Sequence, residues 1–385
     1  MKTITTTDAL AAFCEQAAER PYVTVDTEFL RERTYYSKLC LVQLAYQDED
    51  GDDACLVDPL ADGISLEPLY DLFRDEGVVK VFHAARQDLE IFYVDQQVIP
   101  APLFDTQVAA MVCGFGEQAG YETLVRKITK SDLDKSSRFT DWSRRPLTDA
   151  QANYAVGDVT FLRDIYEYLS DRLKKSGREK WVAEEMAVLN DPATYQADPE
   201  QAWRRVKTRT SSGRFLAIVR ELAKFREQYA QDRNIPRSRV FKDDALVEIA
   251  STKPQSEQDL DRSRLLLREA RKGDIAAGIL AAVKAGVNAP NDSLPKVDQK
   301  GAKLQVNPAL ADMLRVLLKS KSDNEDVAAK LIASSAELDA LAAGERDMKA
   351  MRGWRKEVFG EDAIRLCNGE VGLAVQGQKV VTVAL

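Results

Sequence analysis

The chain contains 385 residues, a length that favours two or three domains, each with a hydrophobic core of its own. Hydrophobic residues make up 45% and charged residues 30% of the chain, which is typical of a globular protein. No apolar run reaches the roughly 20 residues that span a bilayer, so no membrane-spanning segment is expected. The net charge of −8 argues against non-specific coating of nucleic acid. It still allows a nuclease, because bound divalent ions and local basic patches can reverse the sign at the site.

Histidine and cysteine usage narrows the chemistry. His83 is the single histidine, which excludes His-pair zinc sites, H-E-x-x-H proteases and two-histidine ribonuclease chemistry. The five cysteines show no C-x-x-C spacing, so zinc ribbons and disulfide frameworks are not expected. The amino terminus, MKTITTTDALAAFCEQ, has no compact apolar segment, so no secretory signal is expected. These features predict a protein of a reducing compartment, the cytoplasm.

The first half of the chain alternates strand and helix patterns. β-Branched and aromatic residues predict strands over residues 22–25, 38–46, 54–57 and 78–82. Residues 104–106 lie near a fifth strand or the start of a helix. Apolar residues at helical spacing predict helices over residues 66–73, 86–94, 121–128 and 148–174. Three successive strands followed by strand–helix alternation predict an α/β domain with a mixed sheet flanked by helices.

The second half of the chain is almost entirely helical in pattern. Proline, Asn and Asp residues predict a linker over residues 190–200, and a short basic run follows at 203–209. Helical patterns cover residues 213–286 and 307–360, a polar linker separates them at 287–303, and residues 372–383 alternate weakly like a short hairpin. We therefore expect two small helical domains after the α/β domain.

Two carboxylates stand at the end of the first predicted strand, in the segment VTVDTEFL. Side chains alternate between the faces of an extended strand, so Asp26 and Glu28 point the same way. The carboxyl ends of strands are where open α/β sheets bind ligands. Carboxylates this close repel each other unless a proton or cation lies between them, and hard oxygen ligands suit Mg²⁺ or Mn²⁺. For D-x-E by itself, a solvated pair in a loop is the simpler interpretation.

Two further acidic residues stand in suggestive positions. Asp88 lies one turn into the helix that follows the strand at 78–82. Tyr154 and Asp158 are four residues apart, which places them on one face of the long helix at 148–174. For this pair alone, an ordinary hydrogen bond within a helix is the simpler interpretation.

Together, D-x-E at a strand end, an Asp in a later helix and Y-x-x-x-D in a long helix resemble the DEDD exonuclease superfamily. In a related branch His precedes the last Asp, whereas Tyr154 places this chain with the tyrosine-bearing branch. The segments HAARQDLEI, GYETL and DWSRRPLTDAQANYAVGDVTFL are similar to those of the ribonuclease D family. The resemblance implies a ribonuclease H-like fold, with a mixed five-stranded sheet flanked by helices.

A second resemblance covers the helical part of the chain. The segments LAKFRE, NIP and DAL resemble the HRDC domain, a helical nucleic-acid-binding module, and RGWRKEVFG is more loosely similar to a second HRDC-like domain. We therefore expect four parts: an exonuclease domain at residues 1–175, a helical connector and linker at 176–208, an all-α HRDC domain at 209–288 and a second HRDC-like domain at 304–385.

The resemblance also implies the residues that perform the reaction. Asp26, Glu28, Asp88 and Asp158 are expected to hold two divalent ions, Mg²⁺ or Mn²⁺, which stabilise the attacking and leaving oxygens of an in-line displacement. Tyr154 is expected to orient the attacking water. A role as its base would require a strongly lowered pKa, because an unperturbed phenol titrates near about 10. The implied products are nucleoside 5′-monophosphates, released stepwise from the 3′ end.

Further expectations concern substrate contacts. Four residues beside the acids are expected to touch the 3′-terminal nucleotide: Thr27, Phe29, His83 and Gln87. A core position for Phe29 and a packed strand-end position for His83 are the alternatives. The basic and aromatic residues at 31–38 combine side chains as single-strand binders do, or are ordinary turn residues. Arg144 and Arg145 are further candidates for phosphate contacts.

The sequence thus predicts a metal-dependent 3′-to-5′ exoribonuclease acting on structured RNA with single-stranded 3′ ends, with tRNA precursors as the implied substrates. No membrane association and no obligate protein partner is expected. Two alternatives stay open. One is a repair or proofreading exonuclease for DNA, although no polymerase or helicase region is visible. The other is an RNA-binding protein without catalytic activity.

Overall fold

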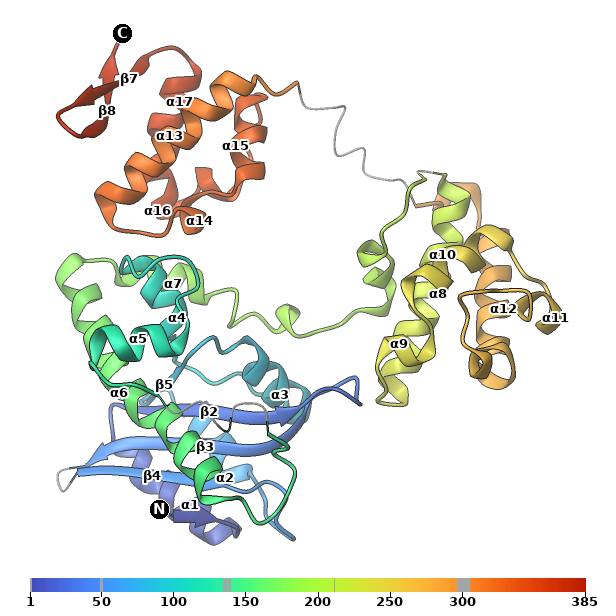
Figure 1. Cartoon of the computed structure of the whole chain (residues 1–385), viewed down its shortest axis with the longest axis horizontal. Coiled ribbons are helices and arrows are strands. Elements are labelled where there is room, and N and C mark those ends of the chain that lie inside the picture. The colour runs from blue at the N-terminus through green and yellow to red at the C-terminus, as the bar shows by residue number, and fades with distance from the viewer. Residues whose placement is uncertain (1, 49–50, 134–136, 138–139, 211, 296–304) are drawn as a thin grey trace. The chain divides into compact units, whose positions relative to one another are not determined.

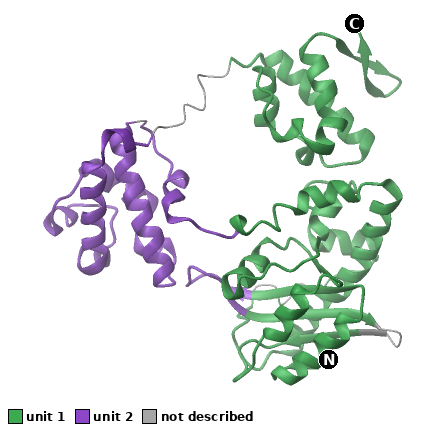
Figure 2. Ribbon diagram, turned by 180° about the vertical axis from the view of Figure 1, so that it is seen from behind, with its two compact units in different colours: residues 1–28, 40–194, 303–385 green, residues 29–39, 195–302 purple. Residues whose placement is uncertain are grey.

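A computed structural model of the chain describes residues 2–48, 51–133, 137, 140–210, 212–295 and 305–385 (Figure 1). Two compact units result: residues 1–28, 40–194 and 303–385 form the first, and residues 29–39 and 195–302 form the second (Figure 2). The later part of the predicted linker at 287–303 lies outside the described residues. Within the described ranges, none of the helices combines the length and the apolarity needed to span a bilayer.

The first unit is built on a sheet in which six described strands follow the order β1–β4–β3–β2–β5–β6. The strands are Lys2–Ile4 (β1), Tyr22–Leu30 (β2), Lys38–Asp48 (β3), Gly51–Val57 (β4), Val79–Phe82 (β5) and Leu103–Asp105 (β6). β1 runs parallel to β4, β3 runs antiparallel to β4, and β5 runs parallel to both β2 and β6. The predicted mixed sheet is confirmed, with one strand more than expected. The sequence analysis missed β1 because three residues, of which only Ile4 is buried, are too short to show a strand pattern.

Helices cover both faces of this sheet (Figure 1). They are Thr7–Ala18 (α1), Glu67–Arg74 (α2), Arg86–Gln96 (α3), Thr106–Val112 (α4), Tyr121–Ile128 (α5), Asp149–Ser176 (α6) and Glu179–Met186 (α7). The long helix α6 crosses one face, and α1, α2 and α3 lie on the other. A capping box begins α6, in which Thr148 Oγ1 accepts a hydrogen bond from the Gln151 N–H at 3.2 Å, and the helix ends at Gly177, whose φ is +67°. The predicted helix at 148–174 is therefore confirmed.

The carboxyl-terminal part of the first unit has a core of its own. Its elements are Pro308–Glu325 (α13), Ala329–Ile332 (α14), Ser335–Ala342 (α15), Gly353–Arg355 (α16), Glu361–Cys367 (α17), Val371–Gln376 (β7) and Lys379–Ala384 (β8). The strands β7 and β8 pair antiparallel, as the predicted hairpin requires. Trp354 and Phe359 are almost fully buried at the centre of this core.

A buried charge cluster joins α7 to this part of the unit. The Glu185 carboxylate accepts hydrogen bonds from the Arg355 guanidinium, from Trp354 Nε1 at 3.3 Å and from Lys349 Nζ at 3.2 Å. The Trp181 ring stacks on the Trp354 ring with 4.5 Å between centroids. Glu185 and Arg355 are both buried, so each is the main counter-charge available to the other.

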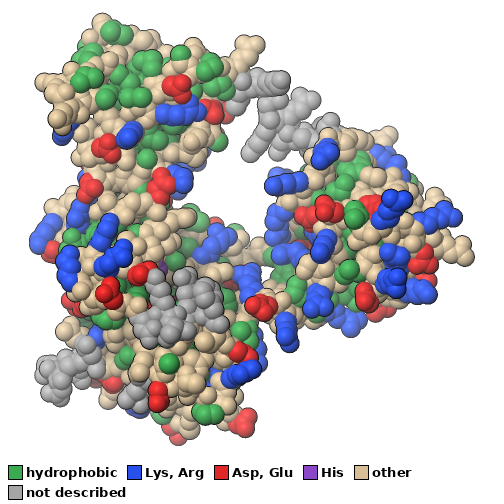
Figure 3. Space-filling view, viewed as in Figure 1, with side chains coloured by type: hydrophobic (Ala, Val, Ile, Leu, Met, Phe, Trp, Pro, Cys, Tyr) green, Lys and Arg blue, Asp and Glu red, His purple; other side chains and the backbone are tan. Residues whose placement is uncertain are grey.

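The second unit is helical. Its helices are Gly213–Asp232 (α8), Arg237–Val240 (α9), Asp243–Thr252 (α10), Glu257–Leu260 (α11) and Gly273–Asn288 (α12). α8 and α12 approach so closely that a Cβ at Gly286 would lie 2.5 Å from the Cα of Ile218, which is why glycine stands there. Lys and Arg side chains are spread over the face of this unit seen in Figure 3.

Residues 29–39, which connect β2 to β3, pack with the second unit. Tyr35 is buried in its core, where the hydroxyl donates to the Glu227 carboxylate and accepts from Arg237 Nη2 at 2.8 Å. Asn234 Oδ1 accepts from the backbone N–H of Tyr35 at 3.1 Å and of Tyr36 at 3.0 Å. The expectation that Tyr35 stacks on single-stranded nucleic acid is therefore wrong, because its ring belongs to a protein core.

Candidate active site

The end of β2 is fastened to α6 next to the predicted catalytic residues. Thr24 is fully buried, and its Oγ1 lies 2.9 Å from the carbonyl oxygen of Val159 in α6 and 3.1 Å from that of Ala45 in β3. Asp26 follows Thr24 on the same face of the strand, and Asp158 precedes Val159. This contact holds the two aspartates beside each other, although 132 positions separate them (158 − 26).

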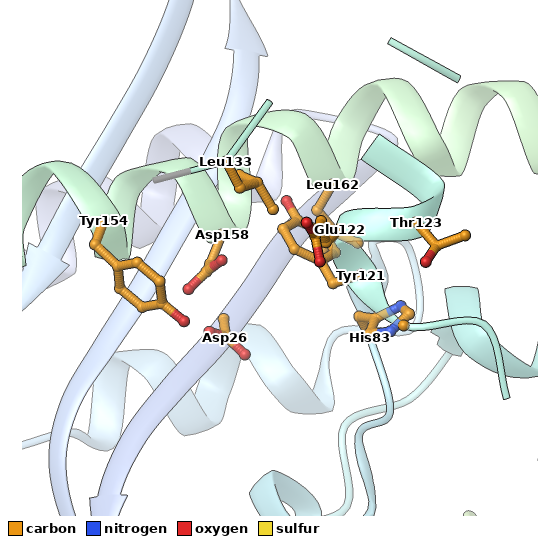
Figure 4. A pocket seen from close by; sticks show the side chains of 10 residues that line it. Asp26, His83, Tyr121, Glu122, Thr123, Leu133, Tyr154, Asp158 and Leu162 are labelled. Atoms are coloured by element: carbon orange, nitrogen blue, oxygen red, sulfur yellow. The ribbon is translucent and has the colours of Figure 1, made fainter. Parts of the chain in front are cut away.

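Asp26, Tyr154 and Asp158 line one pocket of the first unit and point toward one another (Figure 4). The pocket is an open cavity of about 260 Å³. This volume lies just below the range of drug-sized ligand pockets, and the open mouth lets a larger ligand extend beyond it. The rest of the lining comes from α5, α6 and adjoining loops: His83, Gly120, Tyr121, Glu122, Thr123, Leu133 and Leu162.

The four predicted acids act on one another electrostatically. Burial, and then the charges of Asp158, Asp88 and Glu28, raise the pKa of Asp26 well above its usual range. Burial also raises the pKa of Asp88 to about 7, with a smaller contribution from Asp105. Asp26 is therefore close enough to the other three predicted acids for their charges to repel its own, although only Asp26 and Asp158 of the four line the pocket.

Tyr154 is hydrogen-bonded to Asp158, four residues further along α6. Burial, and then the charges of Asp158, Glu28 and Asp26, raise the pKa of its phenol further above the usual 10. Without bound metal the phenol is thus neutral at physiological pH, and it donates its single hydroxyl proton to Asp158. This state suits a residue that orients a water molecule rather than one that removes its proton.

The donor set fits divalent cations. Carboxylate oxygens are hard ligands of the kind that Mg²⁺ and Mn²⁺ prefer, and cations would remove the repulsion that raises the pKa of Asp26. Across the described ranges, no three His, Cys, Asp or Glu side chains are gathered closely enough to form a ligand set as they stand. Asp26, Glu28, Asp88 and Asp158 would therefore have to close around the ions.

The residues predicted to contact substrate occupy different environments. Thr27 is buried, and its hydroxyl donates to Asp88 Oδ1, so it holds one of the acids in place. His83 lines the pocket, Phe29 is half-buried in β2, and Gln87 is exposed on α3. Substrate contact by these four residues stays a prediction.

The two arginines that precede α6, Arg144 and Arg145, have different surroundings. Arg145 pairs with Asp58 through two hydrogen bonds, Nε to Oδ2 at 2.6 Å and Nη2 to Oδ1 at 2.7 Å, and it also donates to backbone carbonyl groups. The expectation that it contacts phosphates is therefore wrong. Arg144 is exposed and pairs with Asp141 at 3.5 Å.

Sequence reasoning missed the residues that position the site. Thr24 shows no signal beyond its place two residues before Asp26. Tyr121 donates from its hydroxyl to the Gly157 carbonyl at 3.0 Å, which fixes α5 against α6 beside Asp158. Tyr121 belongs to the segment GYETL, but that segment was used above only as evidence of a family resemblance.

Comparisons with known proteins agree with this geometry. The profile of the 3′-5′ exonuclease family matches residues 1–174, and that of the HRDC domain matches residues 215–283. The fold and the site together define a 3′-5′ exonuclease with an HRDC domain.

Full-length relatives narrow the assignment. The chain is 64% identical over 378 residues to the ribonuclease D of Jannaschia sp. (strain CCS1), covering 98% of each protein. It is 48% identical over 379 residues to the ribonuclease D of Granulibacter bethesdensis, covering 98% of this chain and 95% of the relative. The crystal structure of Escherichia coli RNase D matches with a TM-score of 0.80 and 31% identity, covering 95% of this chain and 98% of that one. The chain belongs to the ribonuclease D family of 3′-5′ exoribonucleases, as predicted. Nucleases of this superfamily generally depend on divalent metal ions.

If Tyr154 orients the attacking water, its replacement by Phe should reduce kcat by about a hundredfold with little change in KM, because only the phenol hydroxyl is lost while the substrate contacts remain. Steady-state kinetics on a short RNA measures both constants. Tyr168→Phe is the matched control, since Tyr168 lies on the same helix with 42% of its surface exposed. Equal loss in both variants would contradict the role of Tyr154.

Binding of Mg²⁺ to the metal-free protein should release protons and become tighter from about pH 5 to pH 8, because a protonated carboxyl cannot ligate a cation. The pKa of Asp88 is about 7 when folded and 3.8 in its ordinary state, so the folded state keeps a proton that the unfolded chain has lost. The metal-free fold therefore loses stability as pH rises from about 4 to 7. Calorimetric titration in buffers of different ionisation enthalpy measures the release. An affinity independent of pH would contradict the expectation.

Proposed function

We propose that this protein removes nucleoside 5′-monophosphates one at a time from the 3′ end of RNA, using two divalent ions, Mg²⁺ or Mn²⁺. Asp26, Glu28, Asp88 and Asp158 are the proposed ligands. The observation that carries the proposal is the electrostatic effect of Asp158, Asp88 and Glu28 on Asp26, which lines an open pocket. Without a bound cation, the repulsion between these neighbouring carboxylates would be unfavourable.

The chain's own residues have distinct tasks in this reaction. When bound, the two ions supply positive charge for the attacking and leaving oxygens of an in-line displacement. The Thr27 hydroxyl donates to Asp88 and holds that carboxylate in place, and Thr24 keeps α6 against β2. The neutral Tyr154 hydroxyl, next to Asp158, orients the attacking water. The pocket receives the terminal nucleotide, with Thr27, Phe29, His83 and Gln87 as its proposed surroundings.

The proposed substrates are structured RNAs with single-stranded 3′ ends, tRNA precursors among them, and the proposed location is the cytoplasm. The Escherichia coli relative is described as an exoribonuclease involved in structured RNA processing, which supports this class. Lys and Arg side chains on the second unit (Figure 3) suit contacts to RNA phosphates by the HRDC domain at 209–288. The second HRDC-like domain at 304–385 is proposed as a further helical module.

A direct test digests 5′-labelled RNA and DNA of identical sequence side by side, with Mg²⁺, with Mn²⁺ and with chelator. We expect a ladder that shortens from the 3′ end of the RNA, with nucleoside 5′-monophosphates as the released product and no reaction in chelator. Asp158→Asn serves as the inactive control. Equal rates on DNA would favour the repair nuclease, and RNA binding without any released mononucleotide would favour the purely binding protein.

A further inference from the structure

The turn that presents His83 to the pocket is held in an unfavourable backbone conformation. Ala84 has a φ of +58°, in the left-handed region that residues with a Cβ rarely adopt. The buried Asp105 carboxylate stabilises this turn, because it accepts from the Ala84 N–H at 3.0 Å and from the Ala85 N–H at 2.9 Å. A strained turn that its surroundings hold so firmly indicates that the position of His83 matters for function.

The orientation and the tautomer of His83 follow from one further contact. Its Nδ1 lies 2.9 Å from Thr106 Oγ1, and that hydroxyl lies 3.0 Å from the carbonyl oxygen of Phe82. The carbonyl can only accept, so the single hydroxyl proton of Thr106 points to Phe82. Thr106 must then accept from His83, which places the ring proton on Nδ1 and leaves a lone pair on Nε2.

The remaining nitrogen is an acceptor at the pocket wall. No hydrogen bond occupies Nε2 within the part of the chain that the structure describes, and the ring packs near Tyr121 with 5.4 Å between centroids. Figure 4 shows His83 at the opposite end of the pocket from Tyr154 and Asp158. Burial lowers the pKa of the imidazole to about 4, so the ring is neutral and does not attract a phosphate. Nε2 is thus suited to a ligand group that donates a hydrogen bond.

We propose that His83 Nε2 accepts a hydrogen bond from the 2′-hydroxyl of the 3′-terminal nucleotide, which makes His83 a residue that selects RNA over DNA. This inference rests on the proposed function. An enzyme that removes nucleotides of any base needs a donor that all four share, and ribose hydroxyls meet this condition whereas base amino groups do not. Only the 2′-hydroxyl distinguishes ribose from deoxyribose.

The test is a double-mutant cycle between His83 and the terminal sugar. Three RNA oligonucleotides of one sequence end in a ribonucleotide, a 2′-deoxynucleotide or a 3′-deoxynucleotide, and kcat/KM is measured for release of the first nucleotide. We expect loss of the 2′-hydroxyl to cost the unmodified protein about tenfold, as for one hydrogen bond, and to cost His83→Asn less than about twofold. Asn keeps a polar group near the Nδ1 position but nothing at Nε2, so the fold at Thr106 is preserved.

Three further variants keep the outcome interpretable. His83→Gln places an amide near the Nε2 position and should keep most of the 2′-deoxy penalty. Thr106→Val removes the acceptor that sets the tautomer and should reduce the penalty several-fold, whereas Thr106→Ser should restore it. An undiminished 2′-deoxy penalty in His83→Asn, or a penalty coupled to the 3′-hydroxyl instead, would overturn the inference. If the unmodified protein hydrolyses none of the three substrates, the proposed function itself has failed.

Discussion

Replacing Asp26 by Asn should slow RNA hydrolysis by about a thousandfold or more and raise the melting temperature of the metal-free protein at pH 8. Bound cations contribute several kcal/mol of charge stabilisation to reactions of this type, and each 1.4 kcal/mol is about tenfold in rate. The same carboxylate is unfavourable without metal, because burial and three neighbouring acids raise its pKa. An amide of equal shape removes both the ligand and the repulsion. Single-turnover kinetics and thermal melting with chelator measure the two effects.

Asp158→Asn should show the same pair of effects, since Asp158 is the largest charge acting on Asp26. Asp149→Asn is the matched control, because Asp149 is an exposed aspartate on the same helix and should leave both rate and melting temperature almost unchanged. Retention of Mg²⁺-dependent hydrolysis in Asp26→Asn or Asp158→Asn would refute the assignment of the site. A lowered melting temperature in chelator would refute the electrostatic explanation.

Replacing Glu185 by Ala should lower the free energy of unfolding of the first unit by about 3–5 kcal/mol, the cost of removing one partner from a buried ion pair. The substitution leaves the Arg355 guanidinium buried without its carboxylate and removes the acceptor of Trp354 Nε1. Urea titration followed by tryptophan fluorescence measures the change, because Trp181 and Trp354 stack beside the cluster.

The neighbouring Glu184 offers the control for this experiment. It lies on the same helix but is exposed, so Glu184→Ala should change the unfolding free energy by less than about 0.5 kcal/mol. Equal loss in the two variants would show that the buried pair does not determine the effect of Glu185→Ala, because alanine itself favours the helix.

The candidate site could be predicted from the sequence where it depends on local geometry. Asp26 and Glu28 are two residues apart on a strand, and Tyr154 and Asp158 are four residues apart on a helix, so each pair shares a face whatever the rest of the fold does. The grouping of Asp88 with these pairs came from family resemblance. No periodicity in the chain specifies it.

Local sequence patterns gave wrong predictions for side chains whose partners lie far away in the sequence. The aromatic and basic segment at 31–38 has the composition of a nucleic-acid binder, yet Tyr35 is buried against Glu227 and Arg237 of the second unit. Arg145 likewise forms an ion pair with Asp58, which lies 87 positions earlier in the sequence. Neither pairing leaves a trace in neighbouring residues, because both partners are ordinary polar residues in their own segments.

The amino-acid sequence by itself determined the family, the α/β class of the first part, the helical character of the rest and the five residues proposed for the reaction. These follow from short-range spacing and from motifs that remain recognisable without coordinates. The tertiary structure alone decided that Thr24 fastens β2 to α6, that Thr27 holds Asp88 and that Thr106 turns His83 into an acceptor. Such contacts join residues dozens of positions apart, so they exist only once strands have paired and helices have packed.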